Sequence, residues 1–200
     1  MTMQLPNVSR ETQDRLEGYA ALIRKWNPKI NLVSKSSIET LWERHILDSV
    51  QVFQLSDAKG HWLDIGSGGG FPGMVVAILN MEERSFRVSL VESDQRKCAF
   101  LRTVARELDI EAEVFNERIE QLEPQNADVL SARALSSLTQ LMEFSVRHLN
   151  PTGLALFPKG GSWRAEEEEA RKNWDFALQA VPSKTNPEAA VLMIKDIVRA

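Results

Sequence analysis

The sequence predicts an α/β fold built on a mostly parallel, doubly wound sheet. Two observations support this: from residue 61 onward short apolar runs alternate with segments of helical periodicity, and the first run leads into the glycine-rich turn GSGGGFPG at 66–73. Such alternation is typical of parallel sheets, because each crossover between parallel strands needs a helix. The first 56 residues lack the alternation. We therefore expect a helical extension over 1–56 and one compact α/β domain over 57–200.

Two helices are expected in the extension. Ser9 is a candidate N-cap for the first, whose apolar residues recur at helical spacing until Asn27-Pro28, where we expect it to stop. The second is expected to open at Ser36, with Glu39 at capping-box spacing. Its apolar stripe is formed by Ile38, Leu41, Trp42, His45 and Val52.

Five strands and four helices are expected in the α/β domain. The strands are placed at 61–65, 87–92, 112–116, 127–132 and 154–159, with helices near 72–80, 94–108, 137–148 and 162–173. Two further apolar runs, FALQAVPS at 176–183 and AVLMIKDIV at 190–198, are expected to pair as an antiparallel hairpin at one edge of the sheet.

The glycine turn after the first strand suits a ligand that lies on the backbone. A turn that enters a helix presents bare N–H groups, and side chains at Gly66, Gly68 or Gly70 would block close approach. With Asp64 the turn reads D-x-G-x-G-x-G, which resembles motif I of the S-adenosylmethionine-dependent methyltransferases. The shorter G-x-G-x-x-G also fits a dinucleotide. A nicotinamide-dependent oxidoreductase and a nucleotide-binding regulatory module therefore remain alternatives.

The ends of the next strands bring polar groups to the same edge of the sheet, where open α/β sheets bind their ligands. Glu92 follows the second strand and is placed to accept hydrogen bonds from both ribose hydroxyls. After the third strand, the N–H of Ile119 and the carboxylate of Glu120 are placed to contact an adenine edge. Arg133 follows the fourth strand and lies over the same cleft.

Composition gives weaker guidance about partners. The net charge of −4 does not by itself indicate nucleic acid, and the single cysteine excludes an internal disulfide. No secretory or membrane-spanning segment and no metal-ligand spacing is evident, so we expect a cytoplasmic protein without a metal site. Basic residues nevertheless crowd the N-terminal segment, where an RNA-binding face and solvated helix surfaces both remain open: Arg10, Arg15, Arg24, Lys25, Lys29, Lys35 and Arg44.

Several motifs together resemble the bacterial small-subunit rRNA guanine-N7 methyltransferases, the family also called glucose-inhibited division protein B. They are LDIGSGGGFPG, KWNPKINLVS, ERHILDSV, CAFLRTVARELDI, ERIE, SARALSSL and LFPKGG. The resemblance implies a class I methyltransferase fold that uses S-adenosylmethionine and releases S-adenosylhomocysteine. It implies 16S rRNA, or the small ribosomal subunit, as substrate, with a guanine of the 530 loop as target. Carried over by position, the donor contacts are Gly66, Phe71, Ile119, Glu120 and Arg133.

Methylation at guanine N7 needs no general base, because N7 carries a lone pair and no proton. The residues expected near the target, His45 and Lys159, are therefore predicted to position it rather than to take up a proton. A satisfied histidine at the domain junction remains the alternative for His45. Cys98 lies on a stretch predicted to be core, which disfavours cytosine-C5 methylation. No protein partner is inferred, and a monomer is expected.

Overall fold

A computed structural model describes residues 5, 8–57, 59–83 and 85–200; of the predicted 1–56 extension, residues 1–4, 6 and 7 lie outside it. The helices are α1 (Arg10–Ile30), η1 (Lys35–Ser37), η2 (Trp42–Leu47), α2 (Asp48–Gln54), α3 (Gly73–Asn80), α4 (Gln95–Glu107), α5 (Leu138–His148) and α6 (Trp163–Ala170). The strands are β1 (Gly60–Ile65), β2 (Phe86–Val91), β3 (Glu113–Phe115), β4 (Ala127–Ser131), β5 (Leu149–Lys159), β6 (Trp174–Pro182) and β7 (Ala190–Arg199). Of the helices in the described part of the chain, none is long and apolar enough to span a membrane.

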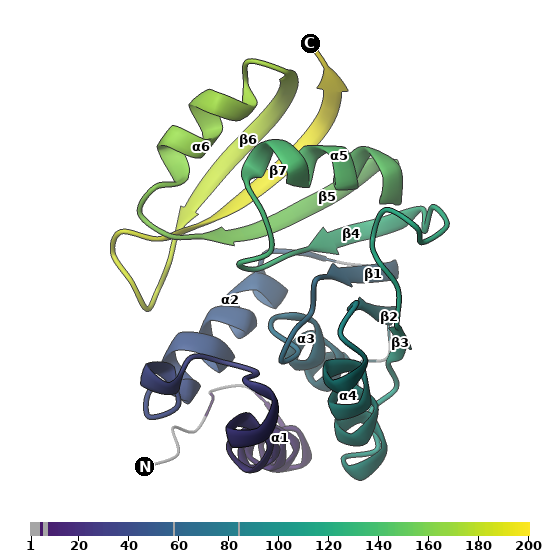
Figure 1. Ribbon diagram of the computed structural model, residues 1–200, viewed down its shortest axis with the longest axis vertical. Coiled ribbons are helices and arrows are strands. Elements are labelled where there is room, and N and C mark those ends of the chain that lie inside the picture. Colours follow the sequence, from purple (N-terminus) through teal and green to yellow (C-terminus); the bar gives the residue numbers. More distant parts are fainter. Residues whose placement is uncertain (1–4, 6–7, 58, 84) are drawn as a thin grey trace.

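The strands form one sheet in the order β3-β2-β1-β4-β5-β7-β6, which confirms the predicted α/β class (Figure 1). The first five strands are parallel, and β7 pairs antiparallel with both β5 and β6. The C-terminal hairpin was therefore predicted correctly. β5 begins at Leu149 rather than at residue 154, because its pairing with β4 shifts register between Ala127 and Val129.

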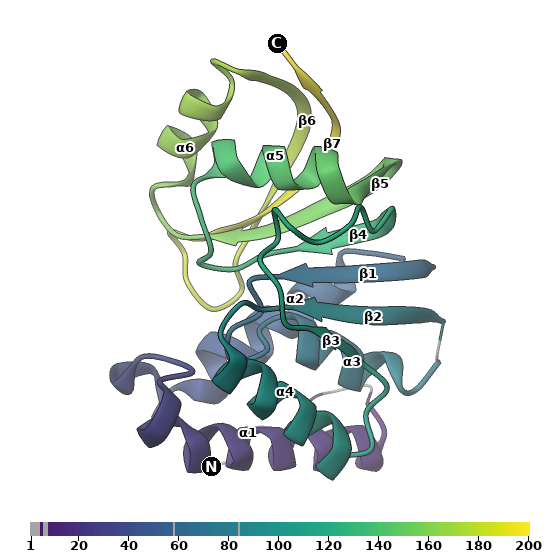
Figure 2. The same ribbon diagram turned by 45° about the vertical axis from the view of Figure 1, so that its right-hand side comes forward.

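Each face of the sheet carries its own hydrophobic cluster. One face presents Trp62, Leu90 and Leu156 to α1, α2, α3 and α4, whereas the other presents Leu63 and Phe157 to α5 and α6. This alternation along β1 follows from the two-residue repeat of a strand. Figure 2 shows α1 and α4 on one side of the sheet and α5 and α6 on the other. The N-terminal helices thus share a core with α3 and α4.

The first helix begins as predicted but ends later. Thr12 N–H donates to the Ser9 hydroxyl at 3.1 Å, which confirms the N-cap. The predicted stop at Asn27-Pro28 is wrong, since Pro28 lies within the last turn of α1. The helix ends only where Asn31 turns left-handed, with φ of 46° and its N–H donating to the Asn27 carbonyl.

The second helix departs further from its prediction. No capping box forms at Ser36 and Glu39, because η1 occupies residues 35–37 and the Ser34 hydroxyl bonds that of Ser37 instead. Regular structure resumes with the π-helix η2 and continues directly into α2. Short π-helical segments are rare and recur at functional sites. This one carries His45.

Candidate active site

Two adjoining hollows lie at the carboxyl ends of the parallel strands. The first, of about 660 Å³, is lined by segments from 32–37, 66–71, 91–97, 117–120 and 133–136. The second, of about 630 Å³, lies beside it and shares Arg44, His45 and the segment 133–136 with the first. Both volumes fall in the usual range for small-molecule sites. Every strand end singled out in the sequence therefore reaches this region.

The glycine turn forms the floor of the first hollow. Gly66, Gly68 and Gly70 all have positive φ, of 64°, 55° and 98°, a conformation that glycine adopts without strain. A Cβ at Gly68 would meet no atom closer than 3.8 Å, so a side chain there would project into open space. Tyr19 of α1 holds the turn from behind, donating its hydroxyl to the Gly69 carbonyl at 2.5 Å.

Glu92 closes one end of this floor. Its buried carboxylate accepts hydrogen bonds from Gly68 N–H at 2.9 Å and from Asp94 N–H at 2.8 Å. The carboxylate thus stands beside the glycine turn at the end of β2, where the sequence placed a ribose contact. That contact itself stays a prediction.

The loop after β3 lines the first hollow with Ile119 and Glu120. Its backbone is held from below by the end of α5, where His148 Nε2 donates to the Ile119 carbonyl at 3.0 Å. Burial lowers the pKa of His148, which keeps the ring neutral. Arg147 donates to the Leu122 carbonyl at 2.8 Å in the same region. These hydrogen bonds hold the loop against the end of α5.

Arg133 and His45 line both hollows, and Phe71 packs against them from the first. The Arg133 guanidinium lies 5.1 Å above the Phe71 ring and donates to the Arg44 carbonyl and to His45 Nδ1. The His45 and Phe71 rings lie 5.0 Å apart. Because a guanidinium can only donate, Nδ1 must accept, and the His45 proton is on Nε2. The sequence singled out all three residues as candidate site residues, but it did not predict that they contact one another.

His45 is neutral at physiological pH. Burial, together with the positive charges of Arg133 and Arg44, lowers its pKa to about 3. Its Nε2 is buried and has no hydrogen-bond partner within the described residues. A neutral ring held by Arg133 suits the positioning role that the sequence predicted for His45, and that role stays a prediction.

Lys159, at the end of β5, lines the second hollow and makes two polar contacts there. Its Nζ donates to the Ser136 carbonyl at 2.8 Å and pairs with Glu166 at 2.7 Å. These contacts anchor the loop after β4, whose residues 133–136 line both hollows together with Arg44 and His45. Contact of Lys159 with a substrate stays a prediction.

Asp64 has a structural role that the motif pattern did not reveal. It is fully buried and accepts a hydrogen bond from the Ser131 hydroxyl at 2.6 Å, which in turn accepts from Trp62 Nε1 at 2.9 Å. Burial raises the pKa of Asp64 to about 6. A Cβ at Gly73 would lie 2.6 Å from this carboxylate, so Gly73 lets α3 pack directly against β1.

The second hollow was not predicted as a unit. Its other lining comes from Asp48, from residues 158–160 at and just after the end of β5, from Glu166 and from the loop between β6 and β7. The sequence marked His45 and Lys159 on its borders. Asp48 stands one turn after His45 in ERHILDSV, and the loop lies beyond residue 161, where the family resemblance gave no guidance.

Comparison with known proteins decides the family. Residues 12–191 match the family described as rRNA small subunit methyltransferase G, GidB. The chain belongs to this family. It is 55% identical to the ribosomal RNA small subunit methyltransferase G of Ruegeria pomeroyi, over 96% of this chain and 95% of that protein. The protein of the same name from Paracoccus denitrificans is 48% identical, over 97% of this chain and all of its own.

The fold of this methyltransferase G family member also resembles solved structures. A methyltransferase from Aquifex aeolicus, described as SAM-dependent, aligns with a TM-score of 0.59 at 14% identity, over 88% of this chain and 96% of its own. The predicted class I methyltransferase fold is therefore confirmed. The dinucleotide-dependent oxidoreductase alternative finds no support in these comparisons.

Proposed function

We propose that the protein transfers a methyl group from S-adenosylmethionine to N7 of a guanine in the 530 loop of 16S rRNA. Family membership makes it an S-adenosylmethionine-dependent methyltransferase of small-subunit rRNA. The target atom and loop rest on the motif resemblance. One structural observation carries the proposal: two hollows of similar size share a wall, as a donor site and an acceptor site must.

The residues of the first hollow fit the donor. Gly68 leaves room on the turn for the methionine part, and the Glu92 carboxylate suits a ribose diol. Ile119 and Glu120 line the same hollow and would hold the adenine, and the Arg133 guanidinium would bind a carboxylate. The donor supplies an electrophilic sulfonium methyl group.

The work of the chain is then to align the acceptor. Guanine N7 has a lone pair and no proton, so the chain would need to supply no base for it to accept the methyl group. Arg133 and His45 line both hollows, so a guanine bound in the second would lie next to a donor bound in the first. A neutral His45 takes no proton in this scheme.

The direct test is methylation of defined RNA with labelled donor. Naked 16S rRNA, a partly assembled subunit and the 30S particle should be compared, and the product mapped by borohydride and aniline cleavage, which is selective for 7-methylguanine. We expect one cleavage site, in the 530 loop, in at least one of the three substrates. An RNA with 7-deazaguanine at that position should accept no label. Label retained by that RNA would disprove the N7 assignment.

We propose that the protein acts as a monomer in the cytoplasm. Among the described residues, one chain supplies the lining of both hollows, which is consistent with a monomer. Its proposed substrate, ribosomal RNA, is available in that compartment. Light scattering of the purified protein tests the oligomeric state.

The substitution His45→Gln is expected to leave substantial single-turnover methyl transfer, with a loss that is constant from about pH 6 to about pH 8.5. With a pKa of about 3, the native imidazole does not titrate in this range. The folding stability, unlike the rate, should depend on pH. Below about pH 6.5 the unfolded chain binds a proton at His45 that the native state does not, so the stability of the wild-type protein falls on acidification. The stability of His45→Gln should fall less over the same range. A rate limb near pH 6.5 that vanishes in His45→Gln would show that the residue is a base.

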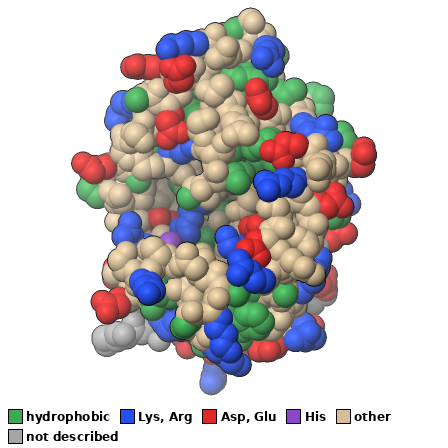
Figure 3. Space-filling model, in the orientation of Figure 1, with side chains coloured by type: hydrophobic (Ala, Val, Ile, Leu, Met, Phe, Trp, Pro, Cys, Tyr) green, Lys and Arg blue, Asp and Glu red, His purple; other side chains and the backbone are tan. Residues whose placement is uncertain are grey.

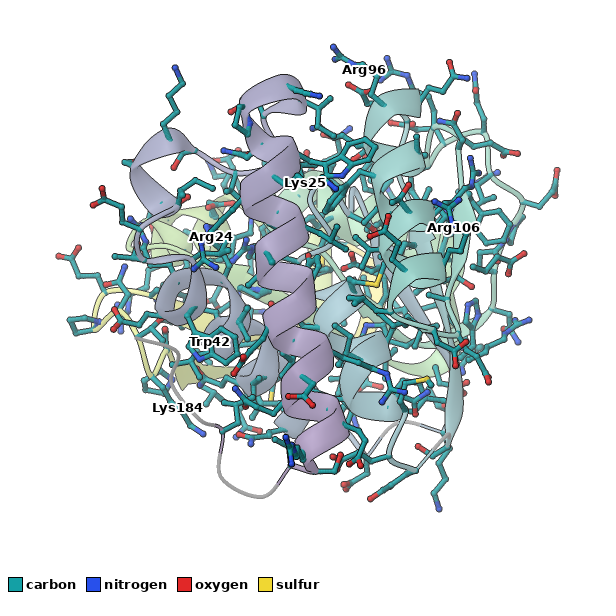
Figure 4. All side chains as sticks on the ribbon, turned by 90° about the horizontal axis from the view of Figure 1, so that it is seen from below. Arg24, Lys25, Trp42, Arg96, Arg106 and Lys184 are labelled. Carbon is teal, nitrogen blue, oxygen red and sulfur yellow. The ribbon has the colours of Figure 1, made fainter. Side chains whose placement is uncertain are left out.

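Reversing the basic residues near the first hollow is expected to weaken RNA binding. The structure divides the N-terminal set: Arg10 begins α1, whereas Lys29 lies about 28 Å along it, next to the segment 32–37 of the first hollow. Figure 4 shows Lys25 on α1, and Figure 3 shows Lys and Arg side chains gathered around a hollow in the front face. The triple change of Lys25, Lys29 and Lys35 to glutamate should flatten the salt dependence by about two to three logarithmic units per decade.

The matched control reverses the charge of three exposed residues outside the rim of the first hollow that Lys25, Lys29 and Lys35 define. These residues are Arg10, Arg106 and Lys195. It makes the same change in net charge. Equal effects of the two triple variants on the salt slope would show that bulk charge, rather than this rim, governs RNA binding. S-adenosylhomocysteine affinity should be unchanged in both.

A further inference from the structure

The second hollow stands where an acceptor base must lie. It is separated from the first hollow only by Arg44, His45 and the segment 133–136, which line both. Asp48, one turn after His45, and the loop between β6 and β7 also line it. A group bound in it can therefore contact the shared wall and Asp48 together.

The loop between β6 and β7 is docked on α2 and is held in place there. Gln51 Nε2 donates to the Pro182 carbonyl at 2.8 Å, and Lys184 N–H donates to Gln51 Oε1 at 2.9 Å. Lys184 Nζ donates to Gln54 Oε1 at 3.1 Å. Figure 1 shows this loop reaching down from the hairpin to α2. The C-terminal hairpin thus completes the hollow.

Asp48 is oriented by the same loop and has acceptor capacity to spare. The hydroxyls of Ser183 and Thr185 both donate to its Oδ1. Its Oδ2 accepts no hydrogen bond from the described residues. A carboxylate fixed through one oxygen presents the other to a ligand without first paying the entropy of ordering.

Glu166, the other carboxylate of the second hollow, is committed elsewhere. Its Oε2 accepts from Leu138 N–H at 3.1 Å and from Lys159 Nζ at 2.7 Å. The lysine also neutralises its charge. Asp48 is therefore the better acceptor for a neutral donor group in this hollow.

Guanine matches this arrangement by its hydrogen-bonding edges. N7 and O6 lie on one edge and accept hydrogen bonds, whereas N1–H and the 2-amino group lie on another and donate. Adenine lacks both of those donors. If N7 meets the methyl group at the shared wall, the donating edge is free to contact another residue of the second hollow, such as Asp48.

We propose that the second hollow receives the target guanine and that Asp48 accepts hydrogen bonds from its N1–H and 2-amino groups. This inference rests on the proposed function and assigns the residue that selects guanine. The interaction pairs a carboxylate with two parallel N–H donors, a geometry that is both strong and specific. Ser183 and Thr185 act as positioning residues for it.

The test compares RNA carrying guanosine or inosine at the target position, because inosine keeps N7, O6 and N1–H but lacks the 2-amino group. The wild-type protein is expected to prefer guanosine by roughly 5- to 150-fold in kcat/KM. In Asp48→Asn the rate on guanosine should fall by a similar factor, and the preference should shrink toward unity. The affinity of Asp48→Asn for S-adenosylhomocysteine should stay within about twofold of the wild-type value, because Asp48 lines only the second hollow.

Glu43→Gln is the matched control, since Glu43 is exposed on η2 and lines neither hollow. It should keep the full preference. If Asp48→Asn does not fold, Ser183→Ala with Thr185→Val removes the orienting hydroxyls and should also reduce the preference. Equal wild-type rates on the two RNAs, or an undiminished preference in the Asp48 or loop variants, would overturn the inference. Absence of any N7 methylation by wild type would instead overturn the proposed function.

Discussion

Replacing Arg133 by methionine is expected to weaken S-adenosylhomocysteine binding by roughly 10- to 150-fold, since a hydrogen bond to a charged group contributes about 1.5–3 kcal/mol. Methionine keeps much of the length and removes the guanidinium. The change also removes the donors to the Arg44 carbonyl and to His45 Nδ1. The shared wall therefore loses its central cation, and methyl transfer should fall further than binding.

Comparison of two ligands locates the effect. S-Adenosylhomocysteine carries the amino-acid carboxylate that Arg133 is proposed to bind, whereas 5′-methylthioadenosine lacks it. Calorimetry should show a large loss for the first ligand and little for the second. Arg106→Met, an exposed change on α4, is the matched control and should affect neither. Equal losses for both ligands would mean that Arg133 supports the site as a whole rather than the carboxylate.

The same variant changes the titration of His45. Arg133 is one of the charges that hold the pKa of His45 near 3, after burial. Without it that pKa should rise toward, but not reach, the ordinary histidine value of about 6.5, because burial remains.

The strand ends of the donor site were predictable because a parallel sheet imposes them. Once the apolar runs ending near Ile65, Val91 and Ser131 are recognised as neighbouring parallel strands, the residues after them must meet at one edge. Gly68, Glu92 and Arg133 were found in this way, and their roles toward the donor remain predictions. The positive φ values in the turn fit its glycines, because glycine has no Cβ to strain that conformation.

The second hollow could not be predicted by the same reasoning. Its walls come from η2, α2 and a hairpin loop that is more than 130 residues distant from Asp48. No periodicity signals that contact, since it depends on how the hairpin docks on α2. The π-helix was not predicted either, because the spacing of Trp42 and His45 also fits the apolar stripe of an α-helix. Division of the chain at residue 56 remains a prediction.

The substitution Gly66→Val is expected to reduce S-adenosylhomocysteine affinity by about 100-fold, which corresponds to about 2.8 kcal/mol. A side chain at this position would fill space that a ligand on the turn needs. A Cβ at Gly66 would also lie 2.5 Å from the exposed side chain of Leu135, which lines both hollows and would have to move. Its φ of 64° also disfavours a β-branched residue.

The stability cost of Gly66→Val can be separated from its effect on the site. Left-handed backbone costs a residue with a side chain about 1–2 kcal/mol, which predicts a fall in Tm of roughly 2–8 °C for a chain of this size. Gly68→Ala bears the left-handed cost without the clash, since φ is 55° and no atom lies within 3.8 Å. Gly161→Val is the neutral control, because Gly161 has no positive φ and its nearest neighbour is 3.4 Å away. If Gly66→Val lowers Tm but binds S-adenosylhomocysteine as tightly as wild type, the turn is not the donor site.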